Sequence, residues 1–121
     1  MLVLEKVDSH DDERRTLIAF RPPDIFPKVV EGKMLVVKND GVSLGKHSHP
    51  HNEGFFLAAG ACNIKTWTAE HGVQEKYLVA PIMFMFEPNE EHLLICAKGT
   101  IIIGYMPVIF GNENNAPAVH L

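Results

Sequence analysis

The sequence predicts an all-β protein with a single domain, built as an antiparallel sandwich or barrel. Short runs of β-branched, aromatic and other apolar residues follow one another along the chain. Turn-forming residues separate these runs at intervals of roughly 8–12 residues, which is typical of such folds. No stretch keeps the 3.6-residue periodicity of an amphipathic helix for more than about two turns. The 121 residues also fit the size of one domain.

Each expected strand is a short β-prone run that a turn signal ends. In chain order, the expected strands cover residues 1–6, 15–20, 34–38, 54–59, 63–68, 74–79, 82–86, 92–97 and 100–106. Residues 11–15 are expected to form a turn or a short helical segment. Prolines at 22, 23 and 27 should keep the next segment a loop. We assign residues 1–110 to the barrel domain, with 34–106 as its core, and expect residues 111–121 to form a mobile tail.

Composition and charge exclude several classes of function. The formal net charge is −4, whereas nucleic acids and anionic membranes favour basic surfaces. No run of about 18 apolar residues is present to span a membrane, and residues 1–6 lack the apolar region of a signal peptide. The two cysteines, Cys62 and Cys96, are too few for a disulfide scaffold. We therefore expect a cytoplasmic protein whose reduced thiols pack as small hydrophobic groups.

Histidines and a glutamate between residues 41 and 60 form a candidate metal site. His47 and His49 are two residues apart, so on a strand they face the same side, about 6.6 Å from each other along the chain. Pro50 cannot donate to a ladder and should end that strand. Glu53 would begin the returning strand, and His92 could reach the same point after a second turn.

The predicted ligands are therefore His47, His49, Glu53 and His92. Imidazole and carboxylate ligands suit divalent Fe, Mn, Zn, Ni or Cu. Four protein ligands leave two positions of an octahedral ion open for substrate, water or dioxygen, as in a catalytic site rather than a structural one. His51 is expected to stay in the turn, although the residues alone leave open whether it joins the site. His10, His71 and His120 are expected to be solvated.

This segment resembles the first sequence motif of the cupin superfamily. Gly41 is followed by five residues, His47-x-His49, three residues, Glu53, six residues and Gly60, which matches that motif without a gap. The second cupin motif is represented by residues 88–92, which lack its two glycines and its asparagine and have a spacing one residue short. The resemblance covers roughly residues 34–106. It implies a jelly-roll barrel, the cupin double-stranded β-helix, that holds the metal inside and often forms a homodimer.

A second resemblance is to the nucleotide-sugar ketoisomerases and epimerases of the same superfamily. It rests on residues 12–18 and on Gly45-Lys46-His47-Ser48-His49. Those enzymes use interior histidines as acid and base and need no metal. In this alternative, His47 and His49 would move protons next to a sugar carbonyl. Glu53 favours the metal interpretation, because it completes a ligand set that such chemistry does not require.

Three functional hypotheses remain open at this point. The first is a metal-dependent oxygenase, isomerase or decarboxylase that acts on a small polar molecule. The second is the metal-free sugar-nucleotide isomerase or epimerase, and the third is a non-catalytic protein that binds a small ligand in the barrel. No residue is assigned as a catalytic acid or base. We also predict a homodimer, because apolar Leu2, Val3 and Leu4 lie in a strand at the chain end that must find a partner.

Overall fold

The computed structural model describes residues 1–4 and 8–121, and every regular element in them is a β-strand. The strands are β1 (Leu2–Leu4), β2 (Asp8–Asp11), β3 (Thr16–Ala19), β4 (Glu31–Val36), β5 (Val42–Ser48), β6 (Glu53–Ala59), β7 (Ala61–Thr68), β8 (Gly72–Val79), β9 (Ile82–Phe86), β10 (Glu91–Cys96), β11 (Ile101–Met106) and β12 (Ala116–Pro117). The predicted all-β fold is confirmed. Within the described ranges, no helix is long and apolar enough to cross a membrane.

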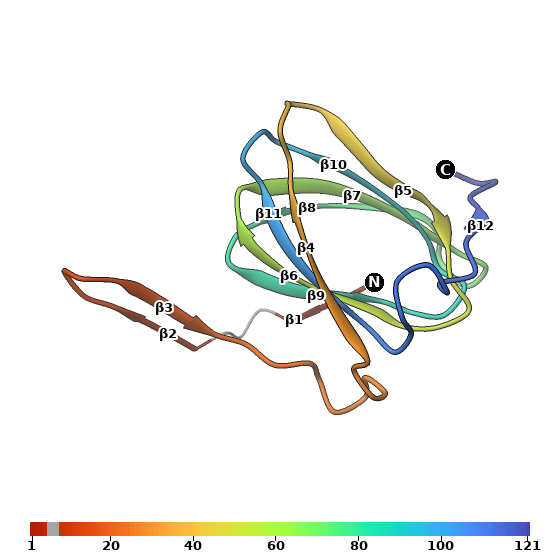
Figure 1. The fold of residues 1–121 in the computed structure, drawn as a ribbon. Helices are drawn as coiled ribbons and strands as arrows, with labels where there is room; N and C mark the ends of the chain where they lie inside the picture. Colours follow the sequence, from red (N-terminus) through yellow and green to blue (C-terminus); the bar gives the residue numbers. More distant parts are fainter. Residues whose placement is uncertain (5–7) are drawn as a thin grey trace.

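Two antiparallel five-stranded sheets enclose the core (Figure 1). One sheet has the order β1-β9-β6-β11-β4, and the other has the order β12-β5-β10-β7-β8. Strands that are neighbours in space are mostly distant in sequence, as when β10 inserts between β5 and β7. This crossing of strands between the sheets is the jelly-roll arrangement. It brings residues from both halves of the chain into one interior.

The interior is filled by large apolar side chains that alternate along the strands. The cluster inside the barrel comprises Val37, Phe55, Leu57, Cys62, Ile64, Leu78, Phe84, Phe86, Leu94, Cys96 and Ile102. A second cluster lies on the outer face of the first sheet, where Phe26 covers Phe56, Met83, Met85 and Tyr105. The predicted alternation on β9, with its phenylalanines on one side and its methionines on the other, is therefore confirmed.

Most predicted strands are present, with differences at the beginning of the chain, at β4 and at β12, which lies in the segment expected to be a tail. The strand expected at residues 1–6 is observed as Leu2–Leu4, and residues 5 and 6 lie outside the described residues. Residues 12–15 form the turn of a hairpin between β2 and β3. Sequence reasoning missed β2, because Asp-Ser-His-Asp is polar throughout and gives no strand pattern.

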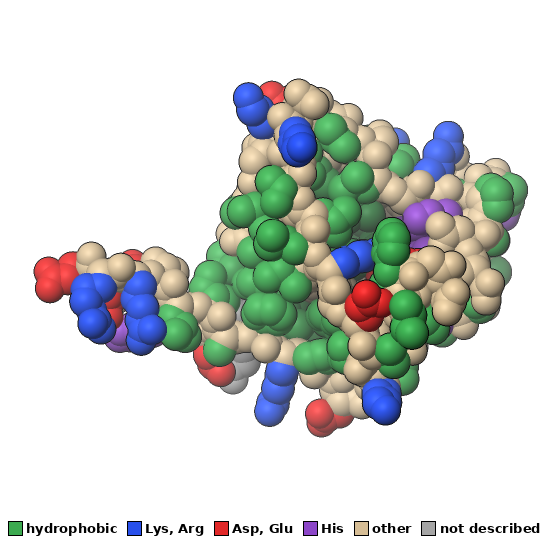
Figure 2. All heavy atoms as spheres, viewed as in Figure 1, with side chains coloured by type: hydrophobic (Ala, Val, Ile, Leu, Met, Phe, Trp, Pro, Cys, Tyr) green, Lys and Arg blue, Asp and Glu red, His purple; other side chains and the backbone are tan. Residues whose placement is uncertain are grey.

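The β2–β3 hairpin extends away from the barrel (Figures 1 and 2). At its base, Phe20 stacks on Phe56 with ring centroids 4.0 Å apart. The N-terminal strand β1 pairs with β9 of the same chain, so it needs no second subunit, and the reason first given for a homodimer does not hold. Exposed apolar residues on β4, such as Met34 and Val36, are what now favour it. The homodimer stays a prediction.

Gly60 is required at the connection between β6 and β7. Its φ of +84° is a conformation that L side chains rarely adopt, and an added Cβ would lie 2.4 Å from Thr100 Oγ1 and 2.7 Å from Thr100 Cα. The Thr100 side chain is fully buried, and its hydroxyl donates to the carbonyl of Ala61, 3.2 Å away. The added Cβ would therefore clash with a buried, hydrogen-bonded side chain and with its backbone.

We therefore expect Gly60→Ala to destabilise the fold far more than Gly72→Ala. Gly72 has a φ of +66°, but an added Cβ would meet no atom within 4 Å. Conformational strain alone should cost about 1–2 kcal/mol at Gly72, whereas the added clash should bring the cost at Gly60 to about 3 kcal/mol or more. Urea unfolding would measure both free energies. Equal losses for the two variants would contradict this explanation.

Candidate active site

Four polar residues predicted from the sequence meet at one end of the barrel interior. Nitrogen atoms of His47, His49 and His92 lie within 4.8 Å of one another. The Oε1 atom of Glu53 lies 3.4 Å from His49 Nε2 and 3.6 Å from His92 Nε2. His49, Glu53 and His92 are buried, and His47 is half-buried. The predicted cluster therefore exists as a cluster, while its role as a ligand set stays a prediction.

The histidines converge because of strand geometry and one irregularity in β5. His47 is the register partner of His92 on β10, and the ladder slips by one residue directly beyond that pair. Lys46 is the extra residue of this bulge and has a φ of +66°. The ring centroids of His47 and His49 are 4.5 Å apart. His49 directly follows the last residue of β5, and its ring lies on the same side as that of His47, so the expected convergence is observed.

His92 has a defined tautomer. Its Nδ1 lies 3.0 Å from the carbonyl oxygen of Glu90, and a carbonyl only accepts, so Nδ1–H donates and Nε2 carries the lone pair. The ring also stacks on Phe86, with centroids 4.1 Å apart. Burial lowers the pKa of His92 to about 4, although the bond to Glu90 and the charge of Glu53 act in the opposite direction. The imidazole is therefore neutral at pH 7 and presents a basic nitrogen toward Glu53.

Glu53 is ionised although it is buried. Burial raises its pKa, but His49, the charge of Lys33 and His92 together lower it to about 2. The Lys33 Nζ atom lies 3.1 Å from Glu53 Oε2. For His47, burial and the neighbouring His49 lower the pKa. The site at neutral pH therefore combines the Glu53 carboxylate and the Lys33 ammonium group with the neutral imidazoles of His47 and His92.

Sequence reasoning missed Lys33, which reaches Glu53 from β4 across the intervening strand β11. The strand was expected to begin at residue 34, so the alternation of Lys33 with Leu35 on the inner face was overlooked. Gly104 of β11 lies between them, paired with Lys33 on one side and with Phe55 on the other. A Cβ on Gly104 would lie 3.1 Å from Lys33 Cε. The absence of that side chain leaves the space through which the lysine passes.

His51 lies beside the cluster without joining it. Its ring is parallel to that of His49, with centroids 5.2 Å apart, but it is not in the group of three converging histidines. Its Nδ1 lies 2.9 Å from the carbonyl oxygen of Asn52. His10 and His71 are exposed, as expected.

The C-terminal segment, expected to be a mobile tail, lies against the barrel, and His120 within it is exposed as expected. β12 pairs with β5 at Ser48 and His47, and Figure 1 shows this segment beside the end of β5. Glu91 accepts hydrogen bonds from the backbone amides of residues 119 and 120 and pairs with the His120 ring. That ring stacks on Trp67, with centroids 3.5 Å apart. These partners are distant in sequence, so tail composition alone could not reveal them.

A cavity of about 160 Å³ opens beside the cluster. It is lined by Lys33, Leu35, Leu44, Gly45, His47, Glu53, Phe55, His92, Leu94 and Ile102. One end is therefore charged and the walls are apolar. In Figure 2, histidine side chains reach the surface at the end of the barrel near the C-terminal segment. Pockets for drug-sized ligands measure roughly 300–1,000 Å³, so this cavity admits only a small part of a larger ligand.

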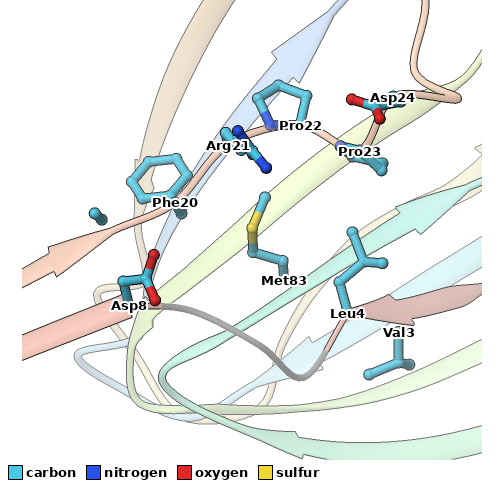
Figure 3. A pocket seen from close by; sticks show the side chains of 10 residues that line it. Val3, Leu4, Asp8, Phe20, Arg21, Pro22, Pro23, Asp24 and Met83 are labelled. Atoms are coloured by element: carbon cyan, nitrogen blue, oxygen red, sulfur yellow. The ribbon is translucent and has the colours of Figure 1, made fainter.

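A larger cavity, of about 830 Å³, lies outside the barrel at the base of the hairpin (Figure 3). Its charged side chains are Asp8, Arg21 and Asp24, and the remainder of its lining is mostly apolar, including Phe20 and Met83. None of the converging histidines lines it. The candidate catalytic groups therefore line the smaller cavity, although the cavity at the hairpin has the larger volume.

The three histidines fit a transition metal better than the full predicted ligand set does. Both nitrogens of His49 and Nε2 of His92 are buried without a hydrogen-bond partner among the described residues. Three imidazole donors suit a divalent ion. Glu53 is different, because the Lys33 ammonium group already neutralises its carboxylate. The role of Glu53 as a metal ligand stays a prediction, and Lys33 competes with a metal for its carboxylate.

The buried His92 predicts that the metal-free protein becomes less stable as the pH is lowered. In the unfolded chain, His92 binds a proton as the pH drops through 6.5, whereas the folded protein resists protonation down to about 4. Acidification through this range therefore favours unfolding, by at most a few kcal/mol, since one pKa unit corresponds to about 1.4 kcal/mol. Glu53 adds a loss in the same direction between pH 4.5 and about 2.

Urea unfolding in the presence of a chelator would test this between pH 7 and 4. We expect His92→Gln to flatten the pH dependence relative to the unsubstituted protein, whatever its effect on stability at pH 7. His71→Asn is the matched control, because His71 is exposed. The same slope in the unsubstituted protein and in His92→Gln would refute the assignment of a neutral, buried His92.

Comparisons with known proteins give fold neighbours only. No protein-family model matches the chain, and no curated protein matches its sequence. A 3,4-ketoisomerase from Helicobacter canadensis is similar at a TM-score of 0.76 and 17% identity, over 94% of this chain and 87% of that one. The sugar 3,4-ketoisomerase QdtA from Thermoanaerobacterium thermosaccharolyticum, in complex with TDP, gives a TM-score of 0.78 and 12% identity, over 95% and 86%.

A third neighbour is dTDP-4-dehydrorhamnose 3,5-epimerase from Bacillus anthracis. Its TM-score is 0.77 at 11% identity, over 95% of this chain and 76% of that one. The predicted resemblance to the ketoisomerase and epimerase branch is therefore matched in structure. At these identities the likeness shows the fold, and it confirms that the chain is a single cupin-type jelly-roll barrel.

Proposed function

We propose that the protein catalyses proton transfer next to the carbonyl group of a nucleotide-linked keto sugar, as a ketoisomerase or epimerase that needs no metal. The observation that carries this proposal is the ionised Glu53 between His49, His92 and the Lys33 ammonium group, beside an open cavity. The fold neighbours, whose names describe sugar ketoisomerases and an epimerase, support it. This is the alternative that the sequence placed second.

Both reactions begin with removal of a proton from the carbon next to a carbonyl group. The base must be uncharged at neutral pH and must reach the cavity. His47 meets both conditions, since burial lowers its pKa and it lines the cavity. His49 lies between His47 and Glu53, so the carboxylate stabilises positive charge on the imidazole pair as the proton arrives.

The negative charge that develops on the substrate oxygen also needs a partner. Lys33 supplies a fixed ammonium group on the cavity wall, and stabilisation of such charge is usually a large part of the rate enhancement. Return of the proton to the opposite face of the same carbon completes an epimerisation. Protonation at the former carbonyl carbon, with the hydroxyl proton released, completes a ketoisomerisation. The cavity of about 160 Å³ takes the sugar ring, which leaves the nucleotide outside the barrel.

We expect the protein to catalyse deuterium exchange into TDP-4-keto-6-deoxyglucose in D2O, detected by NMR at the carbons next to the carbonyl. His47→Asn should slow exchange by about 10²–10⁴-fold, and Lys33→Met by about 10²–10³-fold. The exposed His71→Asn is the control and should retain full activity. Binding of the sugar nucleotide without exchange would replace this proposal with that of a non-catalytic ligand-binding barrel.

A divalent transition metal at His47, His49 and His92 is the second candidate function. The observation that favours it is the group of three imidazoles within 4.8 Å, with unpartnered buried nitrogens on His49 and His92. Such an ion would polarise a substrate carbonyl as a Lewis acid.

Metal analysis and calorimetry separate the two candidates. Under the leading proposal, chelator-treated protein keeps its deuterium exchange, and purified protein contains less than about 0.2 metal per chain, since a real site of this kind should be filled. Stoichiometric Fe, Mn, Zn or Ni, together with exchange that is lost on chelation and restored by the metal, would establish the second candidate instead. Glu53→Gln would then show whether the carboxylate is a ligand, through a large loss of metal affinity.

A further inference from the structure

The only two cysteines of the chain face each other at the apolar end of the barrel. Cys62 on β7 and Cys96 on β10 are register partners of an antiparallel ladder. Their exposed fractions are 0% and 1%, and their sulfur atoms lie 2.6 Å apart. The proposed sugar chemistry uses neither thiol. The sequence led us to expect two reduced cysteines that pack as hydrophobic groups, and it gave no reason to expect them to be paired.

The local ladder places these side chains in the closer of the two antiparallel pairings. The amide of Ala97 donates to the carbonyl of Ala61, 3.1 Å away. Because hydrogen-bonded and non-hydrogen-bonded pairs alternate, the adjacent Cys62–Cys96 pair is non-hydrogen-bonded, with Cα atoms expected about 4.5 Å apart. Disulfides span Cα separations of roughly 4.4–6.8 Å and need sulfurs about 2.05 Å apart. The strands therefore need almost no movement to accommodate the bond.

We propose that Cys62 and Cys96 form a redox-convertible disulfide that joins β7 to β10 inside the barrel. With a disulfide oxidant such as oxidised glutathione, one protein thiolate attacks it and releases one reduced glutathione. The second protein thiolate then attacks the mixed disulfide and releases the other. The two protein thiols lose two protons and two electrons in total, and the oxidant is converted into two thiols.

Either sulfur can donate the hydrogen bond between the two thiols, so either of them can act as the first nucleophile in this exchange. Because both sulfurs are buried, exchange with glutathione requires opening of this end of the barrel or takes place during folding.

The consequence for the molecule follows from the position of β10. This strand lies between β7 and β5, and His92 precedes Cys96 on it by four residues. The bond would also close a loop that contains β8 and β9. Oxidation would therefore stabilise the barrel and restrain the strand that carries His92, without altering any residue of the cavity. The inference holds whether or not the protein acts on sugar nucleotides.

Redox titration of the unsubstituted protein tests the proposal directly. The protein would be refolded to equilibrium in buffers of defined reduced and oxidised glutathione. After denaturation, free thiols would be alkylated and counted by mass spectrometry. The midpoint is the ratio of oxidised glutathione to the square of reduced glutathione at which half of the protein is oxidised. We expect this ratio to be at least tenfold lower for the folded protein than for the protein in urea, because folding holds the two sulfurs together. An equal midpoint would overturn the proposal, as would two alkylatable thiols in the most oxidising buffer.

Single substitutions identify the linkage and its effect. Cys62→Ala and Cys96→Ala should each abolish the internal disulfide and the rise in melting temperature that oxidation gives the unsubstituted protein. Peptide mapping of the oxidised protein should recover Cys62 and Cys96 in one linked pair. Disulfides between chains, or glutathione adducts in place of the linked pair, would also overturn the proposal. If either variant fails to fold, the titration and the mapping decide the question with the natural sequence alone.

Discussion

Glu53 is an ionised carboxylate inside a barrel whose other interior residues are largely apolar, and the arrangement of the polar end depends on it. Removing an isolated carboxylate from water costs on the order of several kcal/mol even after relaxation. Here the cost is offset by the Lys33 ammonium group, 3.1 Å from Oε2, and by the His49 ring, whose Nε2 lies 3.4 Å from Oε1. Without these neighbours the carboxylate would become protonated. The low pKa of Glu53 is therefore a consequence of where its neighbours lie.

The jelly-roll topology explains how one carboxylate obtains these partners. Glu53 and Lys33 belong to one sheet, and His47 and His92 lie on paired strands of the other. The polar groups therefore face each other across the barrel, while the same strands carry apolar side chains toward the opposite end. A bulge at Lys46 changes the direction in which the following histidines point. The docked C-terminal segment adds a strand beside His47. Residues of both sheets form the walls of the cavity.

The sequence could predict those parts of the site that depend on local spacing. His47 and His49 are two residues apart, and a strand places such residues on one face, so their convergence needed no tertiary information. The alternation of methionine and phenylalanine on β9 was predictable for the same reason. The contacts of Lys33 and His120 were not, because each reaches a partner brought close only by strand order. Strand β2 was missed because its sequence is polar and lacks a strand pattern. Only its pairing with β3 makes it a strand.

Lys33 also bears on the choice between the two chemistries. A divalent ion among the three histidines and the ammonium group of Lys33 would both seek the carboxylate of Glu53, and two cations at such short range repel each other. The His-x-His and glutamate spacing is the same in either case, so the motif alone cannot distinguish them. The lysine comes from a strand outside the motif, and it reaches the carboxylate only because Gly104 leaves its path open. The pair Lys33 and Gly104 therefore favours proton transfer beside a fixed positive charge over a metal bound by all four predicted ligands.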